Sequence, residues 1–385
     1  MGGMSLLISR RRALVAAVAA VGGAFGLADL AHSATTDSAA AGPLRVGYLP
    51  ITDAAPLLMA HSAGLYPAGV GKPVLFRSWA ALGEAFLNRQ LDVVHLLMPM
   101  AVQLRYALGG GVRVLGWNHT NGSALTVAPH IRELSDLAGA QVAIPFWWSI
   151  HNIVLQKMLR ANGLQPVIRR SASRSERTVE LVVMSPSDMV PALATGTIGG
   201  YVVADPFNAM AQTKKIGRIH TFLGDVWRDH ACCALVTRDD VIRSRPAAVQ
   251  QLTDAVVAAQ LVLSNDRKSA AAKLGGGRYL PQPVPAVALA MTYPTAPYPL
   301  HHPEWQPQRL GFQPFPFPSF TTALVAAMHS TVVDGDRSFL ERLDLATVHD
   351  DLVDDTFVRN SIQAHGGPAA FGLSDYTRAE QLELS

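Results

Sequence analysis

Short apolar runs alternate with amphipathic segments from residue 44 onward. Apolar runs bounded by Gly, Pro or polar residues predict strands, and apolar residues at helical spacing predict helices. The predicted strands cover 44–50, 73–79, 91–98, 112–118 and 123–129, and helices are predicted between them at 54–62 and 81–90. This alternation is typical of a mostly parallel sheet with helices on both faces, so we predict an α/β fold.

The alternation restarts near residue 130, which predicts a second lobe over about 130–222. In this lobe a helix is predicted from Ile150 to Ala161, capped by Ser149 and ended by Gly163. Ser187 or Asp188 is expected to cap the helix that follows strand 178–184. Later segments predict a strand at 199–206, a strand at 233–238 and a long amphipathic helix at 245–263.

Eleven prolines lie between residues 281 and 318, too many for one helix or a central strand. Two interpretations remain, a segment that wraps the surface and a disordered linker. Interleaved aromatic side chains favour the packed wrap, and they are Tyr293, Tyr298, Trp305, Phe312, Phe315, Phe317 and Phe320.

The N-terminus has the three parts of an export signal. A basic run at Arg10–Arg12 precedes an apolar stretch at 13–30, and small residues follow it. Paired arginines before a Gly/Ala-rich stretch are typical of a twin-arginine signal. A membrane anchor is the alternative, but glycines and Asp29 interrupt or close the apolar stretch. We therefore predict a signal peptide over 1–33 and an exported, periplasmic or extracytoplasmic mature protein, soluble after cleavage.

Composition then excludes several classes of protein. Hydrophobic residues make up 49% of the chain, which excludes a disordered chain. Two cysteines exclude a small fold held by disulfides. The net charge is +3, and most of it belongs to the predicted signal, so no nucleic-acid partner is expected.

Several segments, in order along the chain, resemble one family. They include FRSWAALGEAFLNRQLDVVHLLMPMA, WNHTNGSALTV, IPFWWSIHNIVLQKMLRANGL and VVADPFNAMA. The set is similar to the extracytoplasmic solute-binding proteins of ABC importers. The types it resembles are the nitrate/bicarbonate and sulfonate/taurine binding proteins, and their superfamily also includes binders of thiamine precursors. The resemblance implies a two-lobed, periplasmic-binding-protein-like fold with a ligand cleft between the lobes. Lobe 1 would be 44–127 plus 228–385, and lobe 2 would be 128–227.

The resemblance also implies a function. The protein would capture a small solute and deliver it to an ABC permease and its ATPase at the membrane, as a monomer without catalytic residues, cofactor or metal. The sequence shows no GxSxG, HExxH, P-loop or GxGxxG motif. An enzyme like the thiamine-pyrimidine synthases of this superfamily, using His and Cys with iron, is the alternative, and the predicted export signal argues against it.

Candidate ligand-binding residues lie at strand-to-helix junctions, because ligands of open α/β sheets bind beyond the carboxyl ends of the strands. In the first lobe they are Thr52, Asp53, Trp79, His95, Met98, Asn118 and Ser123. In the second lobe they are Trp147, Trp148, Ser149, His151, Asp205 and Phe207, and His230, Cys232 and Cys233 follow. Two adjacent tryptophans cannot both face one side of a strand, so at least one is expected to line the cleft.

The HACC segment departs from the family pattern. Cys233 stands where the nitrate/bicarbonate pattern carries a lysine that would neutralise a small anion. Its absence favours a sulfonate, aromatic or pyrimidine-like solute over nitrate or bicarbonate. Three interpretations of Cys232 and Cys233 stay open: a vicinal disulfide, metal binding together with a histidine, and buried neutral thiols, which are favoured.

Overall fold

Two β-sheets organise the part of the chain that the computed structural model describes, residues 42–298, 300–305 and 309–384. The predicted signal peptide at 1–33 lies outside the described residues. The chain from Pro43 onward forms one unit, and both sheets belong to it.

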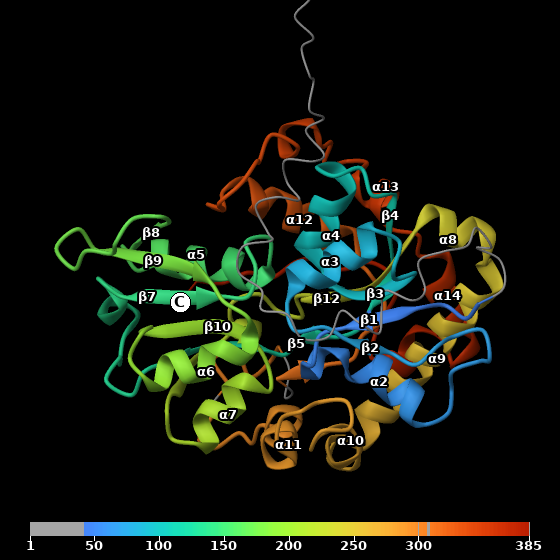
Figure 1. Ribbon diagram of the computed structural model, residues 1–385, viewed down its shortest axis with the longest axis horizontal. Helices are drawn as coiled ribbons and strands as arrows, with labels where there is room; N and C mark the ends of the chain where they lie inside the picture. Colours follow the sequence, from blue (N-terminus) through green and yellow to red (C-terminus); the bar gives the residue numbers. More distant parts are fainter. Residues whose placement is uncertain (1–41, 299, 306–308, 385) are drawn as a thin grey trace, which may run out of the picture. The chain divides into compact units, whose positions relative to one another are not determined.

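The first sheet has five strands in the order β2-β1-β3-β12-β4. Strand β1 pairs in parallel with β2 and β3, and β12 pairs antiparallel with β3 and β4. Strand β12 therefore lies between its neighbours although it is far from them in sequence, and its yellow ribbon can be followed among blue and teal strands (Figure 1). The bounds are Val46–Tyr48 (β1), Val74–Leu75 (β2), Val93–Leu97 (β3), Val112–Trp117 (β4) and Cys233–Arg238 (β12).

The second sheet has six strands in the order β11-β6-β10-β7-β9-β8. The run from β10 to β8 is parallel, and β6 pairs antiparallel with β10 and β11. The bounds are Ser123–Val127 (β6), Gln141–Ile144 (β7), Gln165–Val167 (β8), Thr178–Val183 (β9), Gly200–Ala204 (β10) and Arg218–Phe222 (β11). Two short strands, β5 (Thr120–Asn121) and β13 (Leu310–Gly311), pair separately.

Helices cover both faces of the sheets, which confirms the predicted α/β architecture. Helix α5 packs on one face of the six-stranded sheet, and α6 and α7 pack on the other (Figure 1). The bounds are Ala55–Ser62 (α2), Trp79–Leu87 (α3), Met98–Tyr106 (α4), Ile150–Ala161 (α5), Pro186–Ala194 (α6), Phe207–Thr213 (α7), Asp239–Ser244 (α8), Pro246–Asn265 (α9), Arg267–Leu274 (α10), Val284–Thr292 (α11), Pro318–His329 (α12), Val348–Leu352 (α13) and Thr356–Ala364 (α14).

The bounds of helix α5 agree with those predicted from the sequence. It spans Ile150–Ala161, the Ser149 hydroxyl accepts a hydrogen bond from the Asn152 amide at 3.2 Å, and Gly163 has a positive φ of 68°. The cap satisfies an amide that has no partner within the helix, and the glycine permits the left-handed turn that ends it. Local chemistry therefore fixes both ends of this helix.

Two other element predictions were wrong. The strand predicted at 73–79 is only Val74–Leu75, because Ser78 caps a helix that already begins at Trp79. The cap of α6 is Ser185 rather than Ser187 or Asp188, because Pro186 occupies the first helical position, where its fixed φ fits.

The described part of the proline-rich segment is packed against the protein, as its aromatic side chains predicted. Phe317 and Phe320 are buried and meet the Trp117 indole edge-on, with ring centroids 5.6 and 5.1 Å apart. Trp305, Phe312 and Phe315 are also buried.

Helix α9 is long and apolar enough to cross a membrane, and it is the one such helix among the described residues. Half of that apolar stretch is buried inside the protein, where α9 packs against α2 and α14. This burial is typical of the core helix of a globular fold.

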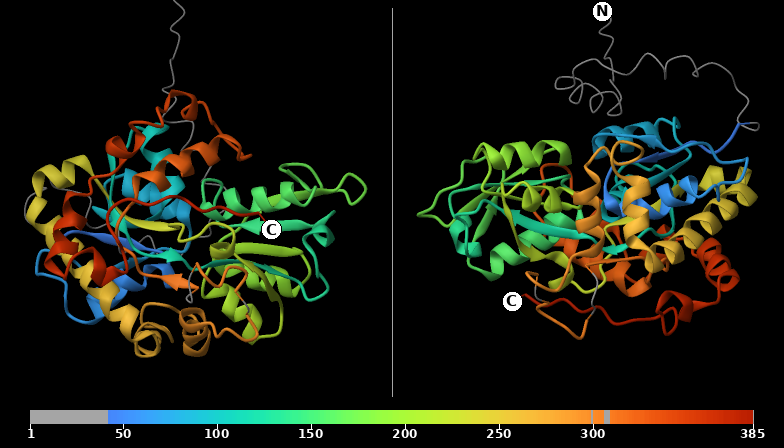
Figure 2. Two further views of the ribbon diagram at one scale, coloured as in Figure 1. Left: turned by 180° about the vertical axis from the view of Figure 1, so that it is seen from behind. Right: turned by 90° about the horizontal axis from the view of Figure 1, so that it is seen from below.

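The chain passes between the sheets twice, through 118–122 and back through 223–232. Figure 2 shows the ribbon from two further sides. Hydrogen bonds join the sheets at the same place. The Thr52 amide donates to the Asp205 carbonyl at 2.7 Å, and the Asp205 amide donates to the Gly122 carbonyl at 3.0 Å.

Gly122 is expected to tolerate no side chain. It has a φ of 80°, and a Cβ there would lie 2.8 Å from Leu310 Cδ1 and 2.9 Å from Asp53 Oδ1. Gly64 is a matched control, because its φ is 71° but nothing lies within 4 Å of a Cβ. In urea unfolding, we expect Gly64→Ala to cost about 1–2 kcal/mol, the backbone penalty alone, and Gly122→Ala to cost at least twice as much. Equal losses would contradict a close approach at Gly122.

Candidate functional site

Polar side chains from both sheets meet where the chain crosses between them. All are at most 1% exposed to solvent. We refer to this group as the polar cluster, and its members are Asp53, His95, Asn118, His119, Ser123, His151, His230, Cys232 and Cys233.

Three structural segments position the centre of the polar cluster. Asp53 lies in the short 3-10 helix Thr52–Ala54, which follows β1. His119 lies on the outgoing crossing after β4. Cys232 and Cys233 lie where the returning crossing enters β12, and Cys233 pairs there with Leu97 of β3. Parallel strand ends and a returning strand thus bring together residues that are far apart in sequence.

The imidazole of His119 contacts both Asp53 and the cysteine segment. Its Nε2 atom lies 3.0 Å from Asp53 Oδ2 and accepts a hydrogen bond from the Cys233 amide at 3.3 Å. A nitrogen that accepts the amide proton has no proton of its own to donate to the carboxyl group. Burial raises the pKa of Asp53 well above its usual range. A proton on Asp53, a proton on Nε2 in place of the amide bond, or a cation between the two groups would satisfy this contact. The Asp53 carboxylate favours the second, because it raises the pKa of His119 to about 10 although burial opposes this.

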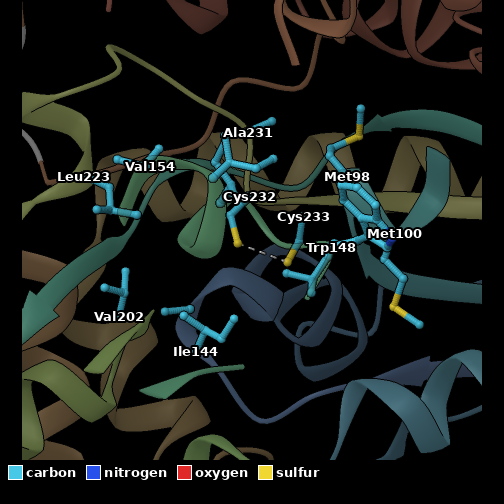
Figure 3. Packing of buried hydrophobic residues seen from close by; sticks show 14 of the residues in the cluster. Met98, Met100, Ile144, Trp148, Val154, Val202, Leu223, Ala231, Cys232 and Cys233 are labelled. Atoms are coloured by element: carbon cyan, nitrogen blue, oxygen red, sulfur yellow. Dashed lines mark hydrogen bonds between the residues drawn. The ribbon is translucent and has the colours of Figure 1, made fainter. Parts of the chain in front are cut away.

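The two cysteines are free thiols. Their sulfur atoms lie 3.6 Å apart, as the dashed line in Figure 3 marks, so the vicinal disulfide considered from the sequence is not formed. The Cys232 sulfur lies 3.8 Å from His151 Nε2, which is also 2.9 Å from the Ser123 hydroxyl. Apolar side chains of the core surround the pair (Figure 3).

Several polar atoms of the cluster have no hydrogen-bond partner among the described residues. They include both side-chain amide atoms of Asn118, both ring nitrogens of His95, Nδ1 of His151 and Nε2 of His230. Buried polar groups in folded proteins are nearly always hydrogen-bonded. These atoms therefore require partners that the described residues do not supply.

His95 and His230 are neutral at physiological pH. Burial lowers the pKa of His95 to about 3 and that of His230 to about 4, because a charged imidazole loses its hydration there. A neutral imidazole can donate from one nitrogen and accept at the other. The polar cluster thus offers hydrogen bonding without added positive charge at these two positions.

The remaining predicted residues of the first lobe lie close to the polar cluster. The Trp79 indole is 6.1 Å from the His95 ring, measured between centroids. Met98 begins α4, and its amide donates to the Cys232 carbonyl at 2.9 Å. The Thr52 hydroxyl donates to the Asp205 carbonyl at 3.0 Å.

Predicted residues of the second lobe have contacts within the fold. Trp148 is buried and meets Phe339 edge-on at 5.6 Å between centroids, whereas Trp147 is partly exposed. Ser149 uses its hydroxyl to donate to the Phe146 carbonyl and to cap α5. Phe207 begins α7, and its carbonyl accepts from the Tyr201 hydroxyl.

Sequence reasoning did not predict two contacts that the structure shows here. His119 belongs to the Asn-His-Thr-Asn run after β4, and its pairing with Asp53 could not be read from the sequence because the two are on different segments. Tyr293 of the proline-rich segment donates to the Asp205 carboxyl at 2.9 Å. No periodicity signals such a contact.

The Asp205 carboxyl group should make stability depend on pH. Burial raises its pKa to about 7, so the folded protein holds a proton that the unfolded chain releases at lower pH. Its stabilising contribution is therefore present below the usual carboxyl range and is lost as pH rises toward about 7. We expect Asp205→Asn to remove a slope of up to about 1.4 kcal/mol per pH unit from the free energy of unfolding. Urea unfolding at several pH values measures it.

The matched control is Asp188→Asn, which changes an exposed aspartate of α6 and should keep the wild-type slope. A wild-type slope in Asp205→Asn as well would contradict a protonated Asp205 in the folded protein.

The fold is that of the periplasmic binding proteins. The structure resembles the nitrate-binding protein NrtA from Synechocystis, with a TM-score of 0.73, 18% identity and coverage of 88% of this chain and 93% of that one. It also resembles the alkanesulfonate-binding protein SsuA from Xanthomonas axonopodis, with a TM-score of 0.57, 17% identity and coverage of 76% and 93%. These likenesses confirm the predicted two-lobed fold class.

Comparison of sequences also finds similarity to binding proteins of transport systems. The nitrate/nitrite binding protein NrtA of a Nostoc species is 27% identical over 241 residues, which are 56% of this chain and 52% of that protein. The chain thus spans about half the length of the curated relatives it matches. A family model described as NMT1-like matches residues 37–275. Since that match covers more than half of the sequence, the chain belongs to the NMT1-like family.

Proposed function

We propose that this protein is the solute-binding component of an ABC importer and that the polar cluster is its binding site. The observation that carries the proposal is a set of fully buried polar atoms, on β3, on both crossings and on α5, that have no hydrogen-bond partner among the described residues. A solute held between two lobes would pair these atoms and would be released when the lobes part. The lobes would be 44–127 plus 228–385 and 128–227, as proposed from the sequence.

The comparisons support a role in transport. Relatives named for nitrate binding, nitrate import and bicarbonate transport match this chain at 25–28% identity. By analogy, the partners would be an ABC permease and its ATPase at the membrane. We also propose export through the N-terminal signal and action as a monomer outside the cytoplasm.

The chemistry of the polar cluster favours a small neutral organic solute. Neither lysine nor arginine belongs to it, and it contains a carboxyl group and two thiols. The Asp53 carboxylate raises the pKa of His119 to about 10 although burial opposes this, so the positive charge of His119 is already paired. A nitrate or bicarbonate ion would therefore lose its hydration without gaining a free cationic partner. Neutral imidazoles, an amide and the nearby Trp79 indole suit a pyrimidine-like or other aromatic solute, which offers both hydrogen-bonding edges and an apolar face. A sulfonate group would likewise lose its hydration without gaining a free cationic partner, although the organic part of the molecule could pack on Trp79.

A ligand screen tests the proposal. The purified protein is assayed by thermal shift and then calorimetry against pyrimidines, aromatic acids, alkanesulfonates, nitrate and bicarbonate. We expect saturable stabilisation by a pyrimidine or aromatic compound, about 2.7 kcal/mol at a hundredfold excess over the dissociation constant, and no turnover. Stabilisation by nitrate alone would overturn the proposed solute class. Conversion of the bound compound to product would replace the binding-protein proposal with an enzyme.

Asn118 provides a residue-level prediction. Its side-chain amide has no partner among the residues that the structure describes, while its backbone amide donates to the Cys233 carbonyl and its carbonyl accepts from Gln260. Asn118→Leu should therefore keep the fold and weaken solute binding at least tenfold, because a buried hydrogen bond to the solute contributes roughly 1.5 kcal/mol. Calorimetry measures the affinity. The control is Asn360→Leu on α14, outside the polar cluster, and unchanged affinity in Asn118→Leu would remove this residue from the site.

A further inference from the structure

We propose that Asp53, His119, Cys232 and Cys233 form a binding site for a divalent transition metal ion, with Zn²⁺ as the best fit. Each residue offers one ligand atom, and these atoms lie within 4.8 Å of one another. All four side chains are fully buried. The proposal goes beyond the proposed function and does not rest on it.

The distances suit a tetrahedral ion. Bonds of about 2.3 Å to sulfur and about 2.1 Å to nitrogen and oxygen, at tetrahedral angles, would place two sulfur ligands about 3.8 Å apart and a nitrogen and an oxygen about 3.4 Å apart. The two cysteine sulfurs are 3.6 Å apart, and His119 Nε2 is 3.0 Å from Asp53 Oδ2. Small side-chain rotations would therefore bring all four atoms into the first coordination sphere of one ion.

The ligand types determine which ions fit. Two sulfurs, one imidazole and one carboxylate are ligands that zinc accepts in tetrahedral sites. Thiolates discriminate against Mg²⁺ and Ca²⁺, which require oxygen ligands. With all four positions filled by the protein the site would be closed, as structural zinc sites are.

An ion would also resolve the electrostatics of the site. A carboxyl group and two thiols are buried together there, and neither lysine nor arginine belongs to the polar cluster. Burying an ionised group without a counter-charge costs several kcal/mol. A divalent cation would supply that counter-charge, and on binding it would take the His119 Nε2 lone pair that now accepts from the Cys233 amide.

The neighbouring residues support the ligands. His151 Nε2 lies 3.8 Å from the Cys232 sulfur and 2.9 Å from the Ser123 hydroxyl. The Met98 amide holds the Cys232 carbonyl, and the ladder between β12 and β3 holds Cys233. Such contacts orient ligands and typically strengthen metal binding.

Metal titration of the full chain tests the proposal. The protein is reduced, treated with a chelator and titrated with Co²⁺ and then with Zn²⁺. We expect one equivalent of Co²⁺ to bind with the intense near-ultraviolet absorption of cobalt–thiolate bonds, and Zn²⁺ to displace it. Absence of stoichiometric binding would overturn the proposal, and so would a mass showing that Cys232 and Cys233 resist reduction as a disulfide.

Variants assign the ligands. Cys232→Ser, Cys233→Ser and Asp53→Asn should each weaken metal binding by more than the roughly ten- to hundredfold that losing a supporting residue costs. The matched control is His349→Gln, a buried histidine that pairs with Thr321 instead, and its metal affinity should equal that of the wild type. Unchanged affinity in both cysteine variants would overturn the proposal.

A measurement on the wild type keeps the proposal testable if the variants fail to fold. X-ray absorption at the zinc edge should show two sulfur neighbours at about 2.3 Å. A zinc ion with only nitrogen and oxygen neighbours would overturn the site. Because these readouts use metal alone, a negative solute screen would leave the metal result intact, and the reverse also holds.

Discussion

Full burial of a carboxyl group, four imidazoles and two thiols is the constraint on which the junction between the sheets depends. Groups of this kind are stable inside a protein only when each finds a hydrogen bond or a counter-charge. The surrounding structure meets part of that requirement. The Cys233 amide reaches His119, the Ser123 hydroxyl reaches His151, and Gly122 leaves room for Asp53. The part that stays unmet identifies where a bound molecule would act.

The fold follows from local signals more completely than the site does. Helix α5 is set by Ser149 and Gly163, both visible in the sequence, and the alternation of strands and helices gives the two sheets. Local signals also compete, which is why the cap at Ser78 starts α3 where an apolar run predicts a strand. For the site, the junction positions were predictable because strand ends share an edge. The pairing of Asp53 with His119 was not, since it depends on the register of segments that meet only in three dimensions.

The cysteine pair acquires a different meaning from its surroundings. In the sequence, Cys233 stands where the nitrate/bicarbonate pattern carries a lysine, and the absence of that lysine favours an organic solute over a small anion. In the structure the same two residues lie within reach of a carboxyl group and an imidazole. Buried thiols without such neighbours would be ordinary core residues. The combination of ligand types, rather than the cysteines themselves, distinguishes this junction from an apolar core.

The position of β12 also has a consequence for how the chain reaches its native state. This strand completes the five-stranded sheet, yet the whole six-stranded sheet lies between it and β4 in the sequence. Pairings of such high sequence separation close a long loop and form slowly. During synthesis, β3 and β4 therefore wait with unpaired edges until β12 emerges. Cys232 and Cys233 reach the junction between the sheets only when β12 pairs, so the polar cluster is completed in one of the later steps of folding.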